Sequence, residues 1–389
     1  MEAAAAVGLR RAARPPVPDG PFLVAGLARA GRAAVELLAE LAGPSAVTGW
    51  DSADRKAMRS VAGQLEAAGV RCRLGGDGVA ALADSGARCV IKSPGVPPDA
   101  PLVQAAEGAG VLVIDELELA WRSSPLPMIG ITGTKGKSTV TTMVAAVCRA
   151  AAGAGHMAGN TDFAPAWSAL PRDASGIAAC EVSSGQIEGC RELLPDVAVL
   201  TNLHPETNRH GSLEATAAIK AQLFVRGQRC VPVAVLNADD AYGRQFAQLV
   251  RERGGRVLTY GRDASADYRV GAVEWTLDGS TAELDTPDGP VRLTTRAPGL
   301  QNAVNGAAAV AVGEAIGLPA ERAAAAVATP IPRPAASTAS TRGRRSTSSS
   351  TWPIRRAASA SACPRCGRWS TAGPGHRCGQ SSGSSVRTP

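Results

Sequence analysis

The stretch from residue 128 to residue 147 constrains the fold of this chain more than any other. It begins with a short apolar strand at residues 128–131, continues through a glycine-rich loop and enters a helix. Apolar residues then recur at positions 140, 143, 144 and 147, which is the spacing of one buried helical face. A strand, a glycine loop and a helix in this order are typical of parallel sheets, so the sequence predicts an α/β fold.

The loop at residues 133–139 has the sequence Gly-Thr-Lys-Gly-Lys-Ser-Thr. The usual phosphate-binding loop carries a glycine where this chain has Ile131, so one position of that pattern fails. The parts that bind phosphate are nevertheless present. The glycines let the backbone wrap phosphate oxygens, Lys137 can neutralise the β- and γ-phosphates, and Ser138 can place its hydroxyl on Mg²⁺. We therefore expect a nucleotide site; the alternative is a glycine-rich turn with an exposed lysine.

A separate α/β unit precedes this loop. Its strands are predicted at residues 22–26, 46–50, 89–91 and 111–114, with a helix at 30–42. This alternation predicts an open parallel sheet that ends near residue 122, and a linker at 121–127. Gly26 and Gly31 form a G-x-x-x-x-G turn, not the dinucleotide fingerprint, but its N–H groups can face a phosphate. Asp51 either bonds a ribose or a base, or is a solvated aspartate.

Polar residues follow the strands that are predicted after the loop. These strands lie at 177–180, 197–200 and 233–236. Open α/β sheets bind ligands at the carboxyl ends of their strands. Glu181, directly after the first of these strands, is therefore a candidate Mg²⁺ ligand or water holder, with a solvated carboxylate as the alternative.

The remaining elements carry weaker chemical signals. Lys220 lies in a helix predicted at 212–224, where a lysine is usually solvated. His204, Glu206 and His210 gather after a strand end and are either site residues or an ordinary polar loop. A hairpin or small meander is predicted at 270–295 and an Ala-rich helix at 303–316.

Charge and composition limit the function classes. Residues 331–389 hold ten arginines and no Asp, Glu or Lys, so the net charge of +7 becomes −3 for residues 1–330. The basic balance belongs to the tail, and no nucleic-acid binding is predicted. No run of 18 apolar residues exists, so no membrane span is expected, and nine scattered cysteines favour a reducing cytoplasm. Residues 1–20 are predicted to be a disordered lead, and the tail cannot bury a core.

Taken jointly, the motifs resemble the Mur ligase family, which includes relatives of folylpolyglutamate synthase. That family's loop is G-T-x-G-K-[ST], shorter than the usual one, which accounts for Ile131. Further blocks that resemble the family are Gly159-Asn160, 180–186, 201–212 with Lys220, 235–240 and 299–305. The resemblance covers residues 20–328 in order. It implies a Rossmann-like UDP-substrate domain at 21–122 and a central P-loop ATPase domain of parallel-sheet type at 127–328.

The resemblance also implies the chemistry. ATP phosphorylates a terminal carboxylate, and the amine of an amino acid attacks the acyl phosphate, with two Mg²⁺ offsetting the negative charge. The implied catalytic residues are Lys137, Glu181, Lys220 in carbamylated form and His204, and the implied metal ligands are Ser138, Glu181 and Lys220. The implied nucleotide-binding residues are Gly133, Thr134, Lys135, Gly136, Lys137, Ser138, Thr139, Asn302 and Asn305. The implied UDP-binding residues are Arg29, Ala30, Asp51, Gly95 and Asn160.

Within the family, the first domain resembles that of the D-glutamate-adding members. The implied substrates are UDP-N-acetylmuramoyl-L-alanine and glutamate, and the implied setting is peptidoglycan precursor synthesis by a cytoplasmic monomer. An L-glutamate-adding relative shares much of the pattern and stays open. A folylpolyglutamate-type ligase is less favoured because it lacks a UDP-binding first domain. A catalytically impaired, nucleotide-binding truncation is a further alternative.

Two departures from the family pattern stand out. Residues 204–211 are one residue shorter than the family's segment and lack its ligand histidine, for which His204 is the candidate substitute. The family's third domain would begin near residue 330, where an Arg/Ser/Pro-rich, low-complexity segment stands instead. We expect residues 329–389 to be disordered and read out of frame. The Cys363, Cys366, His376 and Cys378 spacing in that segment is then an accident, not a zinc site.

Overall fold

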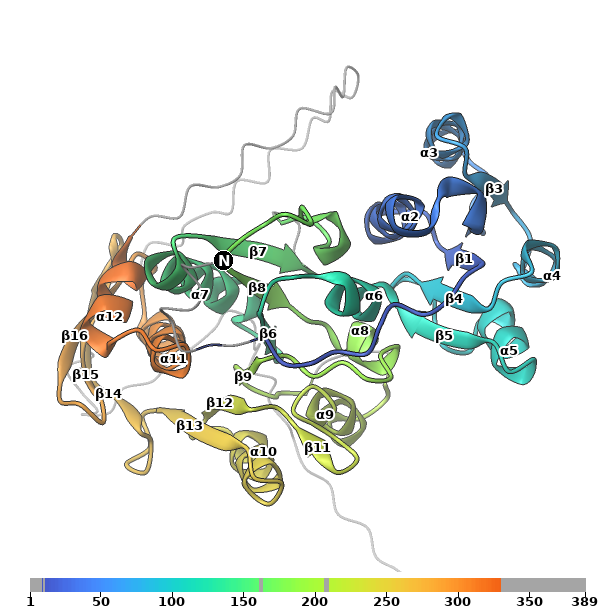
Figure 1. Cartoon of the computed structure of the whole chain (residues 1–389). Coiled ribbons are helices and arrows are strands. Elements are labelled where there is room, and N and C mark those ends of the chain that lie inside the picture. The colour runs from blue at the N-terminus through green and yellow to red at the C-terminus, as the bar shows by residue number, and fades with distance from the viewer. Residues whose placement is uncertain (1–8, 10, 161–163, 206–209, 330–389) are drawn as a thin grey trace, which may run out of the picture. The chain divides into compact units, whose positions relative to one another are not determined.

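The computed structural model describes residues 9, 11–160, 164–205 and 210–329, and the predicted tail lies outside them (Figure 1). Two sheets organise these residues. The first is a five-stranded parallel sheet in the order β3-β2-β1-β4-β5. Its strands are β1 (Phe22–Ala25), β2 (Val47–Asp51), β3 (Arg71–Leu74), β4 (Cys89–Lys92) and β5 (Leu112–Asp115). Its helices are α2 (Arg29–Ala42), α3 (Lys56–Ala67), α4 (Val79–Ser85), α5 (Pro101–Gly108) and α6 (Glu116–Ser123).

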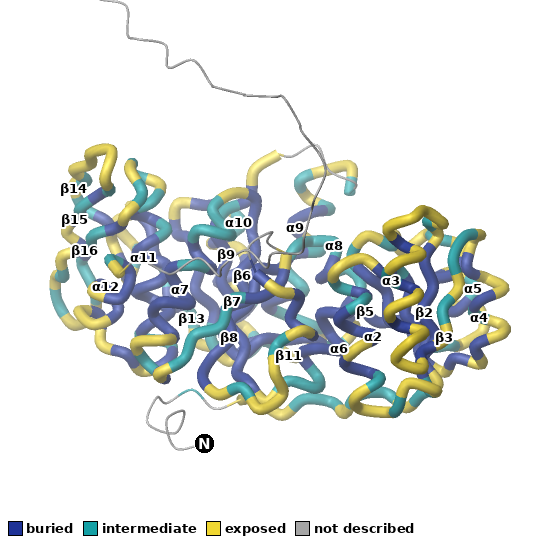
Figure 2. The backbone as a smooth tube through the Cα atoms, turned by 90° about the horizontal axis from the view of Figure 1, so that it is seen from above, coloured by how far each residue is buried: buried dark blue, intermediate teal, exposed yellow. Residues whose placement is uncertain are grey.

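Apolar residues cover both faces of this sheet. Phe22 and Val24 of β1 belong to one buried cluster, whereas Leu23 and Ala25 belong to another. Because successive side chains of a strand point to opposite faces, each face carries its own core. Strands β1, β2 and β4 are buried along their whole length, whereas the edge strand β3 is partly exposed. Figure 2 shows β2 as buried backbone. Burial on both faces is typical of a parallel sheet covered by helices, as the sequence predicted.

The second sheet has nine strands in the order β16-β15-β14-β13-β12-β9-β6-β8-β7. Strand pairs from β7 to β14 are parallel, and β14, β15 and β16 form the antiparallel meander that was predicted at 270–295. Its strands are β6 (Met128–Thr132), β7 (Gly155–Gly159), β8 (Ile177–Glu181), β9 (Val197–Leu200), β12 (Val233–Asn237), β13 (Arg256–Gly261), β14 (Tyr268–Thr276), β15 (Gly279–Asp285) and β16 (Val291–Thr295). Its helices are α7 (Lys137–Ala152), α8 (Ser184–Glu188), α9 (Leu213–Ala221), α10 (Ala241–Arg251), α11 (Leu300–Ala315) and α12 (Ala320–Ala328). A two-stranded ribbon, β10 (Val225–Arg226) with β11 (Arg229–Cys230), stands apart.

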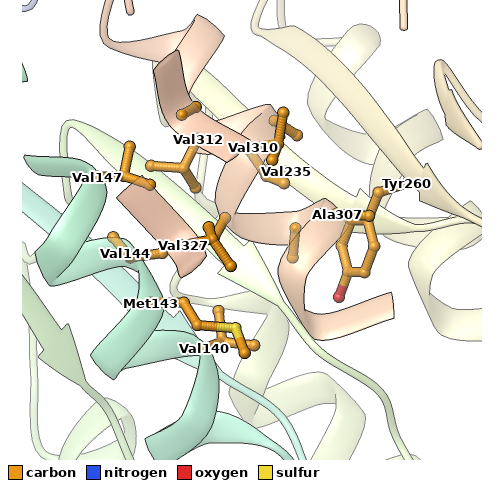
Figure 3. Close-up of a cluster of buried hydrophobic side chains, with 14 of the residues drawn as sticks. Val140, Met143, Val144, Val147, Val235, Tyr260, Ala307, Val310, Val312 and Val327 are labelled. Atoms are coloured by element: carbon orange, nitrogen blue, oxygen red, sulfur yellow. The ribbon is translucent and has the colours of Figure 1, made fainter. Parts of the chain in front are cut away.

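The main core of this part lies between α7, α11, α12 and the sheet. Met143 and Val147 of α7 face Val312 of α11 and Val327 of α12, with Tyr260 of β13 nearby (Figure 3). Most of the buried α11 side chains are alanines and valines, which allow close approach of helices. The predicted amphipathic face of α7 is therefore confirmed as a core face. Among the described helices, none has the length and apolar composition that crossing a bilayer requires.

Several elements differ from the sequence prediction. Strands β3 and β7 were missed because Arg71–Leu74 alternates charged with other residues, and Gly155–Gly159 has no β-branched residue. The linker predicted at 121–127 is helical up to Ser123, because Glu116 and Glu118 favour the first turn and Asp115 caps it. Residues 11–20 are not a disordered lead, since Arg14 is buried in an ion pair with Asp196.

The segment that follows the first sheet contains three buried carboxylates. Asp115 pairs with Lys92 at 3.1 Å, and Glu118 accepts hydrogen bonds from the backbone N–H groups of Arg191 and Glu192. Glu116 Oε1 accepts bonds from the backbone N–H and the hydroxyl of Ser168. Burial raises the pKa of Glu116 to about 7, although the Ser168 hydroxyl opposes the rise. The contacts of Glu116 and Glu118 attach α6 to Ser168, Arg191 and Glu192, which belong to the segment that forms the central sheet.

Glu116 should make stability depend on pH. Its raised pKa means that the folded chain keeps a proton which the unfolded carboxyl, with a pKa of 4.5, has lost. The contribution of this group to stability is therefore full below about pH 4.5 and is lost as the pH rises through 7. Since one pKa unit corresponds to about 1.4 kcal/mol and the pKa rises from 4.5 to about 7, Glu116→Gln should stabilise the chain at pH 8 by roughly 3–4 kcal/mol and at pH 4.5 by little. Thermal unfolding from pH 4.5 to pH 8 measures this.

The control for that experiment is Glu283→Gln, which removes an exposed carboxylate of β15. It should leave the slope of melting temperature against pH unchanged. If Glu116→Gln and wild type keep parallel curves across this range, Glu116 is ionised in the folded chain and the prediction is wrong.

Candidate functional site

The glycine-rich loop joins β6 to α7 at the carboxyl edge of the central sheet. Strand β6 lies between β8 and β9, so residues at the ends of both neighbours flank the loop. Gly133 and Gly136 have φ values of 144° and 82°, a region that favours glycine. A Cβ on Gly133 would lie 2.0 Å from Thr201 Oγ1, so the loop requires glycine there also for space.

The end of β9 fixes the loop backbone. The N–H of Thr134 donates to Asn202 O at 2.8 Å, and the N–H of Lys135 donates to Asn202 Oδ1 at 2.9 Å. Thr201 Oγ1 donates to Lys135 O at 2.7 Å. Thr201 and Asn202 were not among the predicted site residues, although their position after a strand end was the available signal. They hold the loop in shape, which leaves the first N–H groups of α7 available for an anion.

Three of the four predicted catalytic side chains, those of Lys137, Glu181 and Lys220, gather around this loop. Ser138 Oγ donates to Glu181 Oε2 at 2.6 Å, so a hydroxyl of α7 meets a carboxylate at the end of β8. Lys220 is 3% exposed, and its Nζ donates to Gly133 O at 2.8 Å. Lys137 Nζ donates to Thr134 O at 3.0 Å, folded onto its own loop. The glycine-rich loop, the Glu181 carboxylate and the side chains of Lys137 and Lys220 therefore lie together at the carboxyl edge of the central sheet.

The asparagines of α11 approach the same loop. A Cβ on Gly136 would lie 2.9 Å from Asn305 Oδ1, which places the Asn305 side chain against the loop. Asn305 Nδ2 donates to Asn302 Oδ1 at 3.4 Å. Asn305, far from the loop in sequence, therefore lies beside it, and Asn302 contacts Asn305. The nucleotide contacts that the family resemblance implied for both residues stay a prediction.

The donor atoms fit one divalent cation. Hydroxyl and carboxylate oxygens are the ligands that Mg²⁺ prefers, and Ser138 and Glu181 already place two of them together. A second ion fits less well on unmodified side chains, because the Lys220 ammonium is itself a cation. Within the described ranges, no group of three or more His, Cys, Asp and Glu side chains could hold a metal.

The two histidines have different surroundings. His204 is exposed, and its backbone, not its ring, exchanges hydrogen bonds with the Thr134 hydroxyl. His210 Nε2 lies 2.9 Å from Ser184 Oγ, and its Nδ1 lies 3.9 Å from Glu188 Oε1. Glu206, the third member of the predicted cluster, lies outside the described residues. The ring of His204 thus has no described partner that marks it as a metal ligand.

The first sheet carries a separate cavity of about 540 Å³ at the ends of its strands. Its lining includes all five predicted UDP-binding residues: Arg29, Ala30, Asp51, Gly95 and Asn160. Asp51 is already engaged, because its carboxylate accepts from the N–H groups of Leu27 and Ala53 at 2.7 and 2.8 Å. Trp50 and Ser93 also line the cavity and were not predicted. The strand-end cavity and the glycine-rich loop are two candidate ligand sites of an α/β protein.

Comparison with known proteins agrees with this class. Residues 131–313 match the family model described as the Mur ligase middle domain. The UDP-N-acetylmuramoylalanine–D-glutamate ligase of Geobacillus sp. (strain WCH70) is 34% identical over 302 residues, covering 76% of this chain and 63% of that protein. The protein of the same name from Gloeobacter violaceus is 41% identical over 223 residues, covering 56% of this chain and 48% of that protein.

Solved structures agree on the fold. A UDP-N-acetylmuramate:L-alanyl-gamma-D-glutamyl-meso-diaminopimelate ligase from Neisseria meningitides superposes with a TM-score of 0.55 at 19% identity, covering 80% of this chain and 99% of that one. A murein peptide ligase from Psychrobacter arcticus gives a TM-score of 0.52 at 18% identity, covering 79% and 67%. The chain therefore contains a Mur ligase middle domain. It spans about half to two thirds of the length of its curated relatives.

The loop should not tolerate a side chain at position 133. Gly133→Ala places a Cβ against Thr201 Oγ1 at an unfavourable φ, so we expect a loss of roughly 1–3 kcal/mol in the free energy of unfolding. The matched control is Gly63→Ala in α3, where a Cβ meets nothing within 4 Å. Because alanine favours a helix, that control should gain roughly 0.5–1 kcal/mol. Urea unfolding of the two variants measures both; equal effects would contradict the assigned loop geometry.

Proposed function

We propose that this chain belongs to an ATP-dependent ligase that joins D-glutamate to UDP-N-acetylmuramoyl-L-alanine in peptidoglycan precursor synthesis. The observation that carries the proposal is the Ser138–Glu181 contact at the loop of a Mur ligase middle domain. The substrates follow from the names of the relatives in Geobacillus and Gloeobacter. Such a reaction belongs in the cytoplasm, where ATP and the UDP-linked precursor meet.

The proposal assigns one substrate to each part of the chain. Residues 21–122 would bind the UDP portion in the 540 Å³ cavity beside Arg29 and Asn160. Residues 127–328 would bind ATP on the loop, with Asn302 and Asn305 against the nucleotide. Bound Mg²⁺ would neutralise charge on the phosphates, held by Ser138 and Glu181. Lys220 would join as a metal ligand only after carbamylation, which turns its ammonium into a carboxylate.

The chain's own residues then have distinct tasks. Lys137 leaves Thr134 O and pairs with the β- and γ-phosphate oxygens, while the N–H groups at the start of α7 hold the phosphate chain. A carboxylate oxygen of the UDP substrate attacks the γ-phosphorus, and ADP leaves. The amine of glutamate attacks the resulting acyl phosphate, loses a proton and expels phosphate. Thr201 and Asn202 keep the loop rigid throughout, so that the reacting groups stay in line.

The first test measures phosphate release with ATP, Mg²⁺ and UDP-N-acetylmuramoyl-L-alanine. We expect release with D-glutamate and little with L-glutamate. Ser138→Ala and Glu181→Gln should each lower the rate on the order of 10²-fold, because each removes an oxygen next to the phosphates. Arg149→Ala, in the exposed last turn of α7, is the control and should keep the wild-type rate.

The outcomes separate the alternatives. Release with L-glutamate alone identifies the L-glutamate-adding relative. No release, together with a higher melting temperature in ATP and in the UDP substrate, identifies a nucleotide-binding protein without turnover. If neither ligand changes the melting temperature, the proposed function is wrong.

The cavity of the first sheet can be tested separately. Gly95 lines the cavity, and a Cβ added at Gly95 meets nothing within 4 Å, so the backbone there has room for a side chain. Gly95→Leu should weaken binding of UDP-N-acetylmuramoyl-L-alanine by roughly tenfold or more at an unchanged melting temperature, because it occupies ligand volume. Gly108→Leu, at the open end of α5, is the matched control. Calorimetric titration measures both; equal affinities would place the UDP site elsewhere.

A further inference from the structure

The residues before the first strand form an extended strap, defined here as residues 9 and 11–20. Val17 packs against a core cluster of the first sheet, and Leu9 packs against the main core of the central sheet. Arg122 of α6 donates to Pro16 O at 3.0 Å, and Arg11 donates to Arg122 O at 3.5 Å. The strap therefore contacts the apolar core of each sheet as well as the segment between them.

Arg14 is the buried anchor of the strap. Its side chain is 0% exposed, and its Nη2 lies 2.9 Å from Asp196 Oδ2. The guanidinium also donates to Trp121 O at 2.7 Å, to Ser124 O at 3.3 Å and to Leu126 O at 2.9 Å. One planar group thus serves three carbonyls and one carboxylate, which the five donors of arginine allow and a lysine does not.

The segment between α6 and β6, Ser124-Pro125-Leu126-Pro127, requires a donor because of its two prolines. A proline has no N–H, and the residue before a proline is kept out of the helical conformation. Ser124 and Leu126 therefore have carbonyls that no helix or sheet ladder satisfies, and buried carbonyls require a donor. Arg14 supplies that donor to both from 110 and 112 residues away in sequence.

Aromatic rings enclose the anchor. The Arg14 guanidinium carbon lies 5.3 Å from the ring centroid of Trp121 and 5.8 Å from that of Trp167. Cation–π contacts of this kind strengthen when the cation is desolvated. Burial lowers the pKa of Arg14 to about 10, with the Asp196 charge acting in the opposite direction. The side chain therefore keeps its positive charge at neutral pH.

Asp196 links Arg14 to the strands that lead to the glycine-rich loop. Its Oδ2 accepts from the N–H of Met128 at 2.7 Å, and its Oδ1 accepts from the N–H of Ala12 at 2.6 Å. Met128 begins β6 and Asp196 precedes β9, the two strands whose far ends hold the loop and Thr201. Without Arg14, Asp196 would be a buried carboxylate without its cation, which is strongly destabilising.

We propose that the strap is a clamp on the segment joining the two sheets, and that Arg14 is the positioning residue which closes it. The clamp satisfies the carbonyls of a proline-rich connection and fixes the starts of β6 and β9. This part of the inference is independent of the chemistry. Its consequence for turnover, that the UDP cavity and the phosphate loop are held in a working arrangement, rests on the proposed function.

The test compares Arg14→Lys with Arg11→Lys in the full chain. Both substitutions keep the positive charge. Of the two arginines, only Arg14 has a buried side chain that makes several hydrogen bonds. We expect Arg14→Lys to lower the melting temperature by roughly 5–10 °C. Amide hydrogen exchange of peptides spanning residues 121–128 should rise at least tenfold, while peptides from the main core, such as α11, stay within twofold. Arg11→Lys should match wild type in both measurements.

A second arm separates positioning from general stability. At 20 °C, Arg14→Lys should lower kcat for phosphate release about tenfold and leave KM for ATP within twofold. Uniformly faster exchange along the whole chain, or equal effects of the two variants, would overturn the clamp. If wild type releases no phosphate, the exchange experiment still decides the clamp, and only the proposed function fails. Unchanged kcat with localised exchange would overturn the positioning role of Arg14.

Discussion

The parallel order β9-β6-β8 is the constraint on which the candidate site depends. Three parallel strands end at one edge, so the loop after β6, Glu181 after β8 and Thr201 after β9 meet without any long-range coincidence. The loop's own glycines make this approach possible, because any side chain at Gly133 would enter the space of Thr201. The meeting of the loop, the carboxylate and the threonine at this edge is therefore a consequence of the strand order. The sequence has only to supply a glycine, an acid and a hydroxyl at these strand ends.

The block from Glu181 to Gln186 shows that one motif can serve two purposes. Glu181 faces Ser138, whereas Ser183 and Gln186 form a capping box that begins α8. The capping box satisfies N–H groups at the helix start, which fixes the direction in which the chain leaves β8. The acidic member of the motif thus meets the Ser138 hydroxyl at the loop, and the other two hold the strand end in place.

The sequence predicted the site because its signals are local. The loop composition, the strand ends and the apolar face of α7 can each be inferred within a few residues, and the family blocks placed Asn302 and Asn305 near the loop. The role of Arg14 could not be predicted in this way. Its partners lie more than 100 residues away, and an Ala, Arg and Pro-rich lead resembles a segment that cannot bury a core. Likewise, nothing in the local sequence marks Glu116 and Glu118 as buried residues, and only tertiary packing buries them.

Three buried ion pairs of the described residues lie along or beside the connection between the two sheets. Arg14 with Asp196, Lys92 with Asp115, and Arg122 with Glu118 are all largely buried pairs along or beside this connection. Apolar contacts would also hold these segments together, but they are non-directional, so the segments could shift against each other. A hydrogen-bonded ion pair is directional and fixes the position of its two partners. Under the proposed function, a UDP-linked carboxylate must reach the phosphate loop, and that reaction requires a fixed geometry. The cost of burying these charges is visible in the pKa of Asp115, which burial raises to about 6 although the Lys92 charge opposes the rise. Such a cost is consistent with a junction built for position.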